Sequence, residues 1–209
     1  MIAQGYQKHI FKSAKLQSIM EEAISFFEKT PVHNLPPQSA FPGPGVYAIY
    51  YVGPHKIYTA VVANNNKECV LPIYVGKAVP PGSRTARNIS SNTPDLYKRL
   101  REHSKSIQHS PDFDLSDFKC RFMILSDVES QLISITESSL IRKYRPLWNT
   151  CIDGFGNHDP GSGRYNQACS EWDVLHPGRS WAKKLKGKSP QIEKILLKIE
   201  KHLDLKSKS

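Results

Sequence analysis

Two short strand-like runs, each carrying a tyrosine close to a glycine, constrain the fold of this chain more than any other feature. Residues 45–52 read Gly-Val-Tyr-Ala-Ile-Tyr-Tyr-Val, and residues 70–76 read Val-Leu-Pro-Ile-Tyr-Val-Gly. Both are rich in the β-branched and aromatic residues that favour strands, and glycine and proline bound them. A tyrosine in a strand usually only packs, so Tyr47 and Tyr74 by themselves predict two half-buried strands and no chemistry.

A helix that carries a guanidinium and an imidazole follows the second run. Its start is signalled by residues 93–95, Thr-Pro-Asp, because threonine caps helices well and proline fits the first helical turn. Arg99 and His103 are four residues apart on this helix and therefore share one face. The spacing predicts that the two side chains point into the same space.

A third strand and a second long helix come next. Residues 118–125 alternate in character, which predicts the strand, and the helix is expected to begin after a capping residue at Ser126 or Asp127. Glu137 lies on this helix at the margin of an apolar face. The members of that face are Ile133, Leu140, Ile141 and Tyr144. A carboxylate in such a place must be paired, hydrogen-bonded or bound to a metal ion.

In this order the motifs resemble the GIY-YIG nuclease superfamily. Its signature is a Gly-Ile/Val-Tyr strand, a Tyr-Ile/Val-Gly strand, a helical arginine, a helical glutamate, and an asparagine just after that helix. Here the corresponding positions are residues 45–47, residues 74–76, Arg99, Glu137 and Asn149. The interval between the two tyrosine strands is longer than a minimal module needs. Its residues 56–63 fit either a short helix or an extra strand.

Further segments are similar to the type II restriction endonucleases of this superfamily. They are residues 72–82, His103, the Gly-rich residues 154–164, residues 172–173 and residues 176–181. The resemblance implies an α/β (α+β) core with a three-stranded mixed or antiparallel sheet flanked by helices. We expect one domain with three parts: an N-terminal helix and Pro-rich arm (1–44), a catalytic core (45–149), and a Gly-rich loop with a C-terminal helix (150–209).

The composition agrees with a polyanionic partner. Lysine and arginine number 29 against 19 acidic residues, which gives a net charge of +10. No apolar run approaches the length of a membrane span, and the N-terminus has no signal-peptide layout, so we expect a cytoplasmic protein without membrane association. The four cysteines are widely spaced without a Cys-x-x-Cys pair, which predicts free thiols.

The resemblance also implies a metal-assisted cleavage of phosphodiesters. Glu137 would hold Mg²⁺, with Mn²⁺ as a substitute, because Mg²⁺ keeps several waters and needs only one or two carboxylates beside the substrate phosphate. Arg99 would offer planar paired donors to the scissile phosphate.

The resemblance makes Tyr47 the expected general base, with Tyr74 and His103 assisting or competing. A phenol with an ordinary pKa of about 10 is a poor base at neutral pH, so it needs nearby positive charge or a hydrogen-bond acceptor. Lys77, His103 and the metal could supply that. His103 could instead take the proton itself or relay it from Tyr47. Asn149 is expected to order the site by hydrogen bonding.

A free-standing enzyme of this kind acts on double-stranded DNA and works beside a cognate DNA methyltransferase. It most simply cuts both strands as a twofold homodimer at a palindromic site. Four arginines in Gly/Pro/Ser-rich loops would either read guanine or hold phosphates: Arg84, Arg87, Arg164 and Arg179. The expected target is a GC-rich palindrome, and the closest resemblance points to CCGCGG.

Two other functions stay open. One is a repair or homing nuclease of the same superfamily, although homing relatives append a separate DNA-reading domain, for which the residues after Asn149 are too few and too loop-rich. The other is a non-catalytic DNA-binding protein on the same scaffold. The presence of Tyr47, Arg99 and Glu137 together weakens that second alternative.

Overall fold

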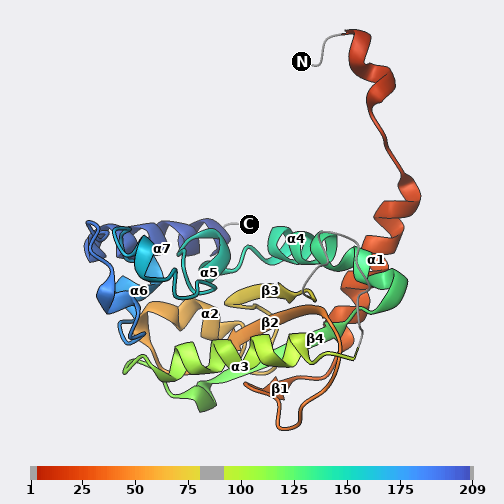
Figure 1. Cartoon of the computed structure of the whole chain (residues 1–209). Helices are drawn as coiled ribbons and strands as arrows, with labels where there is room; N and C mark the ends of the chain where they lie inside the picture. The colour runs from red at the N-terminus through yellow and green to blue at the C-terminus, as the bar shows by residue number, and fades with distance from the viewer. Residues whose placement is uncertain (1–3, 81–91, 208–209) are drawn as a thin grey trace.

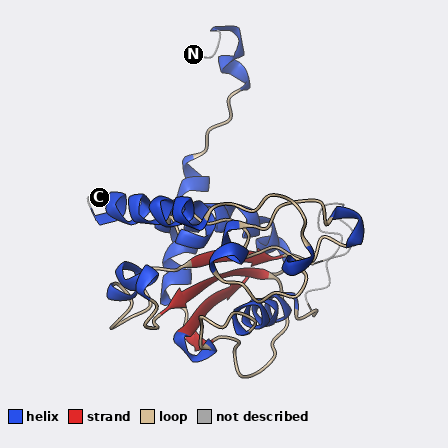
Figure 2. Cartoon of the chain, turned by 90° about the vertical axis from the view of Figure 1, so that its left-hand side faces the viewer, coloured by secondary structure: helices blue, strands red, loops and turns tan. Residues whose placement is uncertain are grey.

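An antiparallel sheet with helices on both faces forms the centre of the molecule (Figures 1 and 2). The structure, a computed structural model, describes residues 4–80 and 92–207. The strand order is β1-β4-β2-β3, with β1 at His33–Asn34, β2 at Gly45–Tyr51, β3 at Tyr74–Ala78 and β4 at Phe118–Ile124. The predicted α+β class is confirmed, and the three predicted strands are present. A short fourth strand, β1, was missed by the sequence prediction, and all the strand pairs are antiparallel.

Helices account for most of the rest of the described chain. The α-helices are α1 (Ala14–Lys29), α2 (Thr59–Ala63), α3 (Asp95–Gln108), α4 (Ile133–Tyr144), α5 (Leu147–Thr150), α6 (Glu171–Leu175) and α7 (Ile192–Ser207). Short 3-10 helices are η1 (Gln4–His9), η2 (Lys56–Tyr58), η4 (Leu115–Asp117), η5 (Asp127–Leu132), η6 (Ser162–Arg164) and η7 (Ala182–Lys184). The segment that fitted either helix or strand, residues 56–63, is helical.

Strand β2 is buried along its whole length because a helical layer covers each face of the sheet. Tyr47, Ile49 and Tyr51 point to the face packed against α3 and α5. Val46 and Ala48 point to the other face, where α1 and α4 pack. This double burial explains why the strand reads as a continuous apolar run rather than an alternating one.

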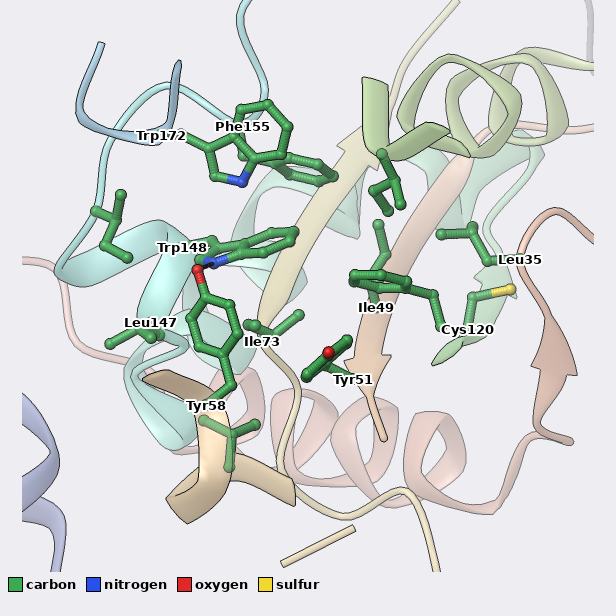
Figure 3. Close-up of a cluster of buried hydrophobic side chains, with 14 of the residues drawn as sticks. Leu35, Ile49, Tyr51, Tyr58, Ile73, Cys120, Leu147, Trp148, Phe155 and Trp172 are labelled. Carbon is green, nitrogen blue, oxygen red and sulfur yellow. Dashed lines mark hydrogen bonds between the residues drawn. The ribbon is translucent and has the colours of Figure 1, made fainter. Parts of the chain in front are cut away.

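An aromatic cluster joins the C-terminal half of the chain to the first of these faces (Figure 3). Trp148 donates a hydrogen bond from Nε1 to Tyr58 Oη at 3.1 Å. The ring centroid of Phe155 lies 4.5 Å from that of Trp148 and 5.2 Å from that of Trp172. The loop after α5 is therefore packed onto the core beside α3 and β3.

Strand β3 begins later than the apolar run that predicted it. Asn65 Oδ1 accepts from the backbone N–H groups of Val70 and Leu71 at 3.0 and 2.8 Å, and its Nδ2 donates to Leu71 O at 2.9 Å. Pro72 has no N–H to offer a neighbouring strand. One side chain thus satisfies the backbone that a longer strand would have paired.

All four cysteines are free thiols, as the sequence predicted. Within the described residues, no helix has the length and apolar character needed to cross a membrane.

The glycine that opens β2 predicts a steric requirement. Gly45 has a φ of +158°, and a Cβ built there would overlap the backbone oxygen of Met123 on the neighbouring strand. We expect Gly45→Ala to lower the free energy of unfolding by about 2 kcal/mol or more. Gly163→Ala is the control, because no atom lies within 4 Å of its added methyl group, and it should shift stability by no more than about 0.5 kcal/mol. Equal urea midpoints for the two variants would contradict this reading.

Candidate active site

The register of β2 against β3 brings two tyrosines to one face of the sheet. Tyr47 lies opposite Gly76 and Ile49 opposite Tyr74, and directly opposed residues share a face. The ring centroids of Tyr47 and Tyr74 are 6.2 Å apart. A Cβ on residue 76 would overlap the Tyr47 hydroxyl, so the glycine of the second motif leaves room for the tyrosine of the first.

Helix α3 places His103 against Tyr47. The Tyr47 hydroxyl and His103 Nε2 are 2.5 Å apart, and both residues are buried. Burial and then the positive charge of Arg99 hold the pKa of His103 well below its ordinary value, so the imidazole is uncharged at neutral pH. In the tautomer that carries its proton on Nδ1, the Tyr47 hydroxyl donates this hydrogen bond and His103 Nε2 is placed to receive the proton of the tyrosine.

Neither tyrosine ionises readily in this setting. Burial raises the pKa of Tyr47 well above 10 and also raises the pKa of Tyr74. The positive charge of Arg99 lowers the pKa of both tyrosines, and the negative charge of Glu137 raises both. A tyrosine base in this site therefore depends on a proton acceptor or on further positive charge.

Arg99 is held by three hydrogen bonds. Its Nη1 donates to Glu102 Oε2 at 2.8 Å and to His158 Nε2 at 2.5 Å, and its Nη2 donates to Gly156 O at 2.9 Å. Sequence reasoning missed Gly156 and His158 as parts of the site. The available signal was the Gly-rich character of residues 154–164, which predicted a shaped loop without saying what it touches.

Glu137 and Lys77 approach from the other face of the sheet. Lys77 Nζ lies 2.9 Å from Glu137 Oε2 and donates to Ser134 Oγ at 3.2 Å. The Glu137 side chain is 19% exposed, and its charge raises the pKa of Tyr47 and Tyr74 from the far side of the edge strand β3. A partly exposed carboxylate offers the oxygen ligands that Mg²⁺ prefers, so Glu137 is chemically suited to bind magnesium.

Asn149 completes the edge of the sheet. Its Oδ1 accepts from Val75 N at 2.7 Å, and its Nδ2 donates to Val75 O at 2.8 Å. These are the two backbone groups that a further strand beside β3 would have paired. The asparagine therefore fixes the strand that carries Tyr74 and Lys77.

The predicted DNA contacts fall into three cases. Arg84 and Arg87 lie outside the described residues. Arg164 is exposed on η6, where its Nε donates to Pro160 O at 3.0 Å. Arg179 is buried.

The placement of Arg179 corrects the prediction that it contacts DNA. The residue is 2% exposed, and its Nε and Nη2 donate to the Asp173 carboxylate at 2.6 and 2.7 Å. The guanidinium carbon lies 4.7 and 4.6 Å from the ring centroids of Trp172 and Trp181. Its guanidinium is engaged inside the protein and is not presented to a DNA groove.

A second cluster of metal-ligand side chains lies outside this set. His55, Asp112 and His176 bring their ligand atoms within 4.8 Å of one another. Both nitrogens of His176 have partners: Nε2 is 2.5 Å from Tyr58 Oη, and Nδ1 is 3.1 Å from Asp112 Oδ2. Imidazole-rich sites suit zinc rather than magnesium, and no residue predicted for catalysis belongs to this cluster.

Comparison with known proteins identifies a family. A family model described as the Eco29kI GIY-YIG domain matches residues 39–203. No curated protein matches the chain. The matched range contains β2, β3 and β4, both helices that bear the candidate side chains, and the loop that contacts Arg99.

Two buried imidazoles predict how stability depends on pH. Burial lowers the pKa of His103 and takes the pKa of His176 to about 4, whereas histidine in an unfolded chain titrates at about 6.5. Below that pH the unfolded chain binds more protons than the folded one, so the free energy of unfolding should fall between about pH 7 and pH 5. Urea unfolding across this range measures the slope. The slope should be shallower in His103→Gln, and an unchanged slope would contradict an uncharged His103.

Proposed function

The chain belongs to the Eco29kI GIY-YIG domain family, a family of type II restriction endonucleases, and from this premise we propose that it is a Mg²⁺-dependent enzyme that cleaves double-stranded DNA at a specific site. Tyr47, Arg99 and Glu137 lie around strand β3, close enough for the charges of Arg99 and Glu137 both to act on the pKa of Tyr47, and this arrangement supports the proposal. Family membership supports a nuclease, and the side chains needed for phosphodiester hydrolysis are all present.

Arg99 and Glu137 have complementary roles in this proposal. Arg99 neutralises charge that builds up on the scissile phosphate, where planar paired donors match two phosphate oxygens. Glu137 would hold Mg²⁺, for which Mn²⁺ is expected to substitute, and the ion would supply charge neutralisation and a more acidic bound water. Lys77 orients the Glu137 carboxylate through their ion pair.

Tyr47 and His103 act together as the proton acceptor. Tyr47 takes a proton from the attacking water while its own proton moves to His103 Nε2 along their 2.5 Å hydrogen bond. The charge of Arg99 is one cause of the low pKa of His103. A phosphate bound to Arg99 offsets that charge, so substrate binding makes His103 a better acceptor. Tyr74 assists from the same face.

The finer proposals concern the substrate and the assembly. The arrangement of one nuclease site per chain favours a homodimer on a palindromic target. Exposed apolar side chains on and before α1 support a second copy as partner: Tyr6, Phe11 and Phe26. The segment before α1 extends away from the body of the molecule (Figure 1). We propose that the target is a GC-rich palindrome, with CCGCGG as the first sequence to test. Arg164 is proposed as one of the DNA contacts. A cognate methyltransferase is the proposed functional partner.

A plasmid digest tests the function directly. The purified protein with Mg²⁺ should give discrete fragments whose mapped ends share a GC-rich palindrome. Glu137→Gln should slow cleavage by about 10²-fold or more and spare most DNA affinity, because phosphate contacts elsewhere carry the binding. Glu129→Gln, an exposed glutamate on η5, is the matched control and should cut normally. Normal cleavage by Glu137→Gln would refute its role, and random or AT-rich ends would refute the target.

The proton acceptor is tested by removing single hydroxyls. Tyr47→Phe should leave folding and DNA binding intact and slow single-turnover cleavage by about 10²-fold or more, the usual contribution of general base catalysis. Tyr74→Phe should have a smaller effect. Equal and trivial effects at both positions would transfer the role to His103 alone.

A further inference from the structure

The loop that follows α5 contacts the candidate active site at three residues. The ring of Phe155 stacks on His103, with centroids 4.6 Å apart and planes inclined by 17°. Gly156 O accepts from Arg99 Nη2, and His158 Nε2 accepts from Arg99 Nη1. None of these residues belongs to the motifs that identified the site. The loop nevertheless contacts both side chains that α3 contributes.

His158 contacts Arg99 and is also exposed to solvent. Its side chain is 64% exposed, and it lines a cavity of about 660 Å³ together with Asn157, Asp159 and Arg164. A guanidinium only donates hydrogen bonds, so His158 Nε2 is the acceptor from Arg99 and the ring proton lies on Nδ1. Arg99 thereby fixes the tautomer and leaves the N–H of His158 as a donor.

A buried clamp holds this loop in place. Arg179 Nη1 donates to the carbonyl oxygens of Phe155 and Asn157 at 3.1 and 3.2 Å, and Nη2 donates to Gly154 O at 2.9 Å. Its ion pair with Asp173 is buried on both sides, and such a pair is costly to break. These hydrogen bonds fix the backbone on both sides of Gly156. They thereby also set the direction in which the His158 side chain points.

We propose that His158 donates from Nδ1 to a DNA backbone phosphate next to the scissile phosphate that Arg99 contacts, and that Arg179 is the positioning residue that presents it. The proposal rests on the proposed nuclease function. It adds to the site a phosphate ligand that comes from the loop rather than from the sheet or α3. The Nε2 and Nδ1 atoms of one imidazole point in diverging directions, so a ring that accepts from Arg99 directs its N–H toward the neighbouring phosphate. Holding that phosphate fixes the scissile phosphate in position for the chemical step.

The experiment is single-turnover cleavage of a duplex that contains the target site, with DNA affinity measured separately without Mg²⁺. His158→Ala should lower the cleavage rate by about 10²-fold, the cost of a small misplacement of the reacting groups, and leave affinity nearly unchanged, because many other phosphate contacts carry the binding. His158→Gln keeps an N–H donor and should recover part of the rate. His109→Ala, an exposed histidine after α3, is the matched control and should cut like the unmodified protein.

The positioning role is tested in a double-mutant cycle. Arg179→Lys keeps the charge beside Asp173 but loses the planar guanidinium that donates to three carbonyls, so it should slow cleavage. The urea midpoint of this variant is measured to check that it folds. In the His158→Ala background the same substitution should have little further effect, because the residue that the clamp presents is already gone. Losses that simply multiply would show that Arg179 does not act through His158 and would overturn its role in positioning that residue.

The failure of this proposal differs from failure of the nuclease function. If the unmodified protein cuts and His158→Ala cuts at the same rate, His158 is not a phosphate ligand. Faster cleavage by His158→Ala would also overturn the proposal, since it would mean that the histidine competes with DNA for Arg99. If the unmodified protein does not cut and Glu137→Gln is indistinguishable from it, the nuclease function itself fails.

Discussion

The antiparallel pairing of β2 with β3 is the constraint on which the candidate site depends. It places Tyr47 across from Gly76 and sends both motif tyrosines to the face that α3 covers. The same register sends Lys77 to the opposite face, where it meets Glu137 on α4. If β3 slipped by one residue against β2, its side chains would move to the opposite faces of the sheet, and these pairs would separate. The close fit of Gly76 under the Tyr47 hydroxyl therefore also helps to fix the register.

Burial and one cation then set the chemistry of that face. Taking Tyr47 and His103 out of water keeps both uncharged, and Arg99 beside them opposes the protonation of the imidazole. In the proposed mechanism a phosphate bound to Arg99 offsets this effect of the guanidinium. DNA binding would then be linked to proton transfer through Arg99.

Much of this arrangement could be predicted from the sequence because it follows local periodicity. The helical spacing of Arg99 and His103 and the marginal position of Glu137 are properties of short segments, and the structure keeps them. Arg179 and His158 depend instead on which distant carbonyls and side chains the folded loop brings together. Because Arg179 lies among glycine and proline residues, the sequence predicts an exposed side chain, and no neighbouring residue indicates that it is buried.

The position of the bound metal ion distinguishes the proposed active site from the histidine cluster. Crystals of the protein with its target duplex and Mn²⁺ would locate the ion by its anomalous scattering. We expect a peak within ligand distance of the Glu137 carboxylate, next to a phosphate that Arg99 contacts. A peak between His55, Asp112 and His176, with none at Glu137, would contradict it.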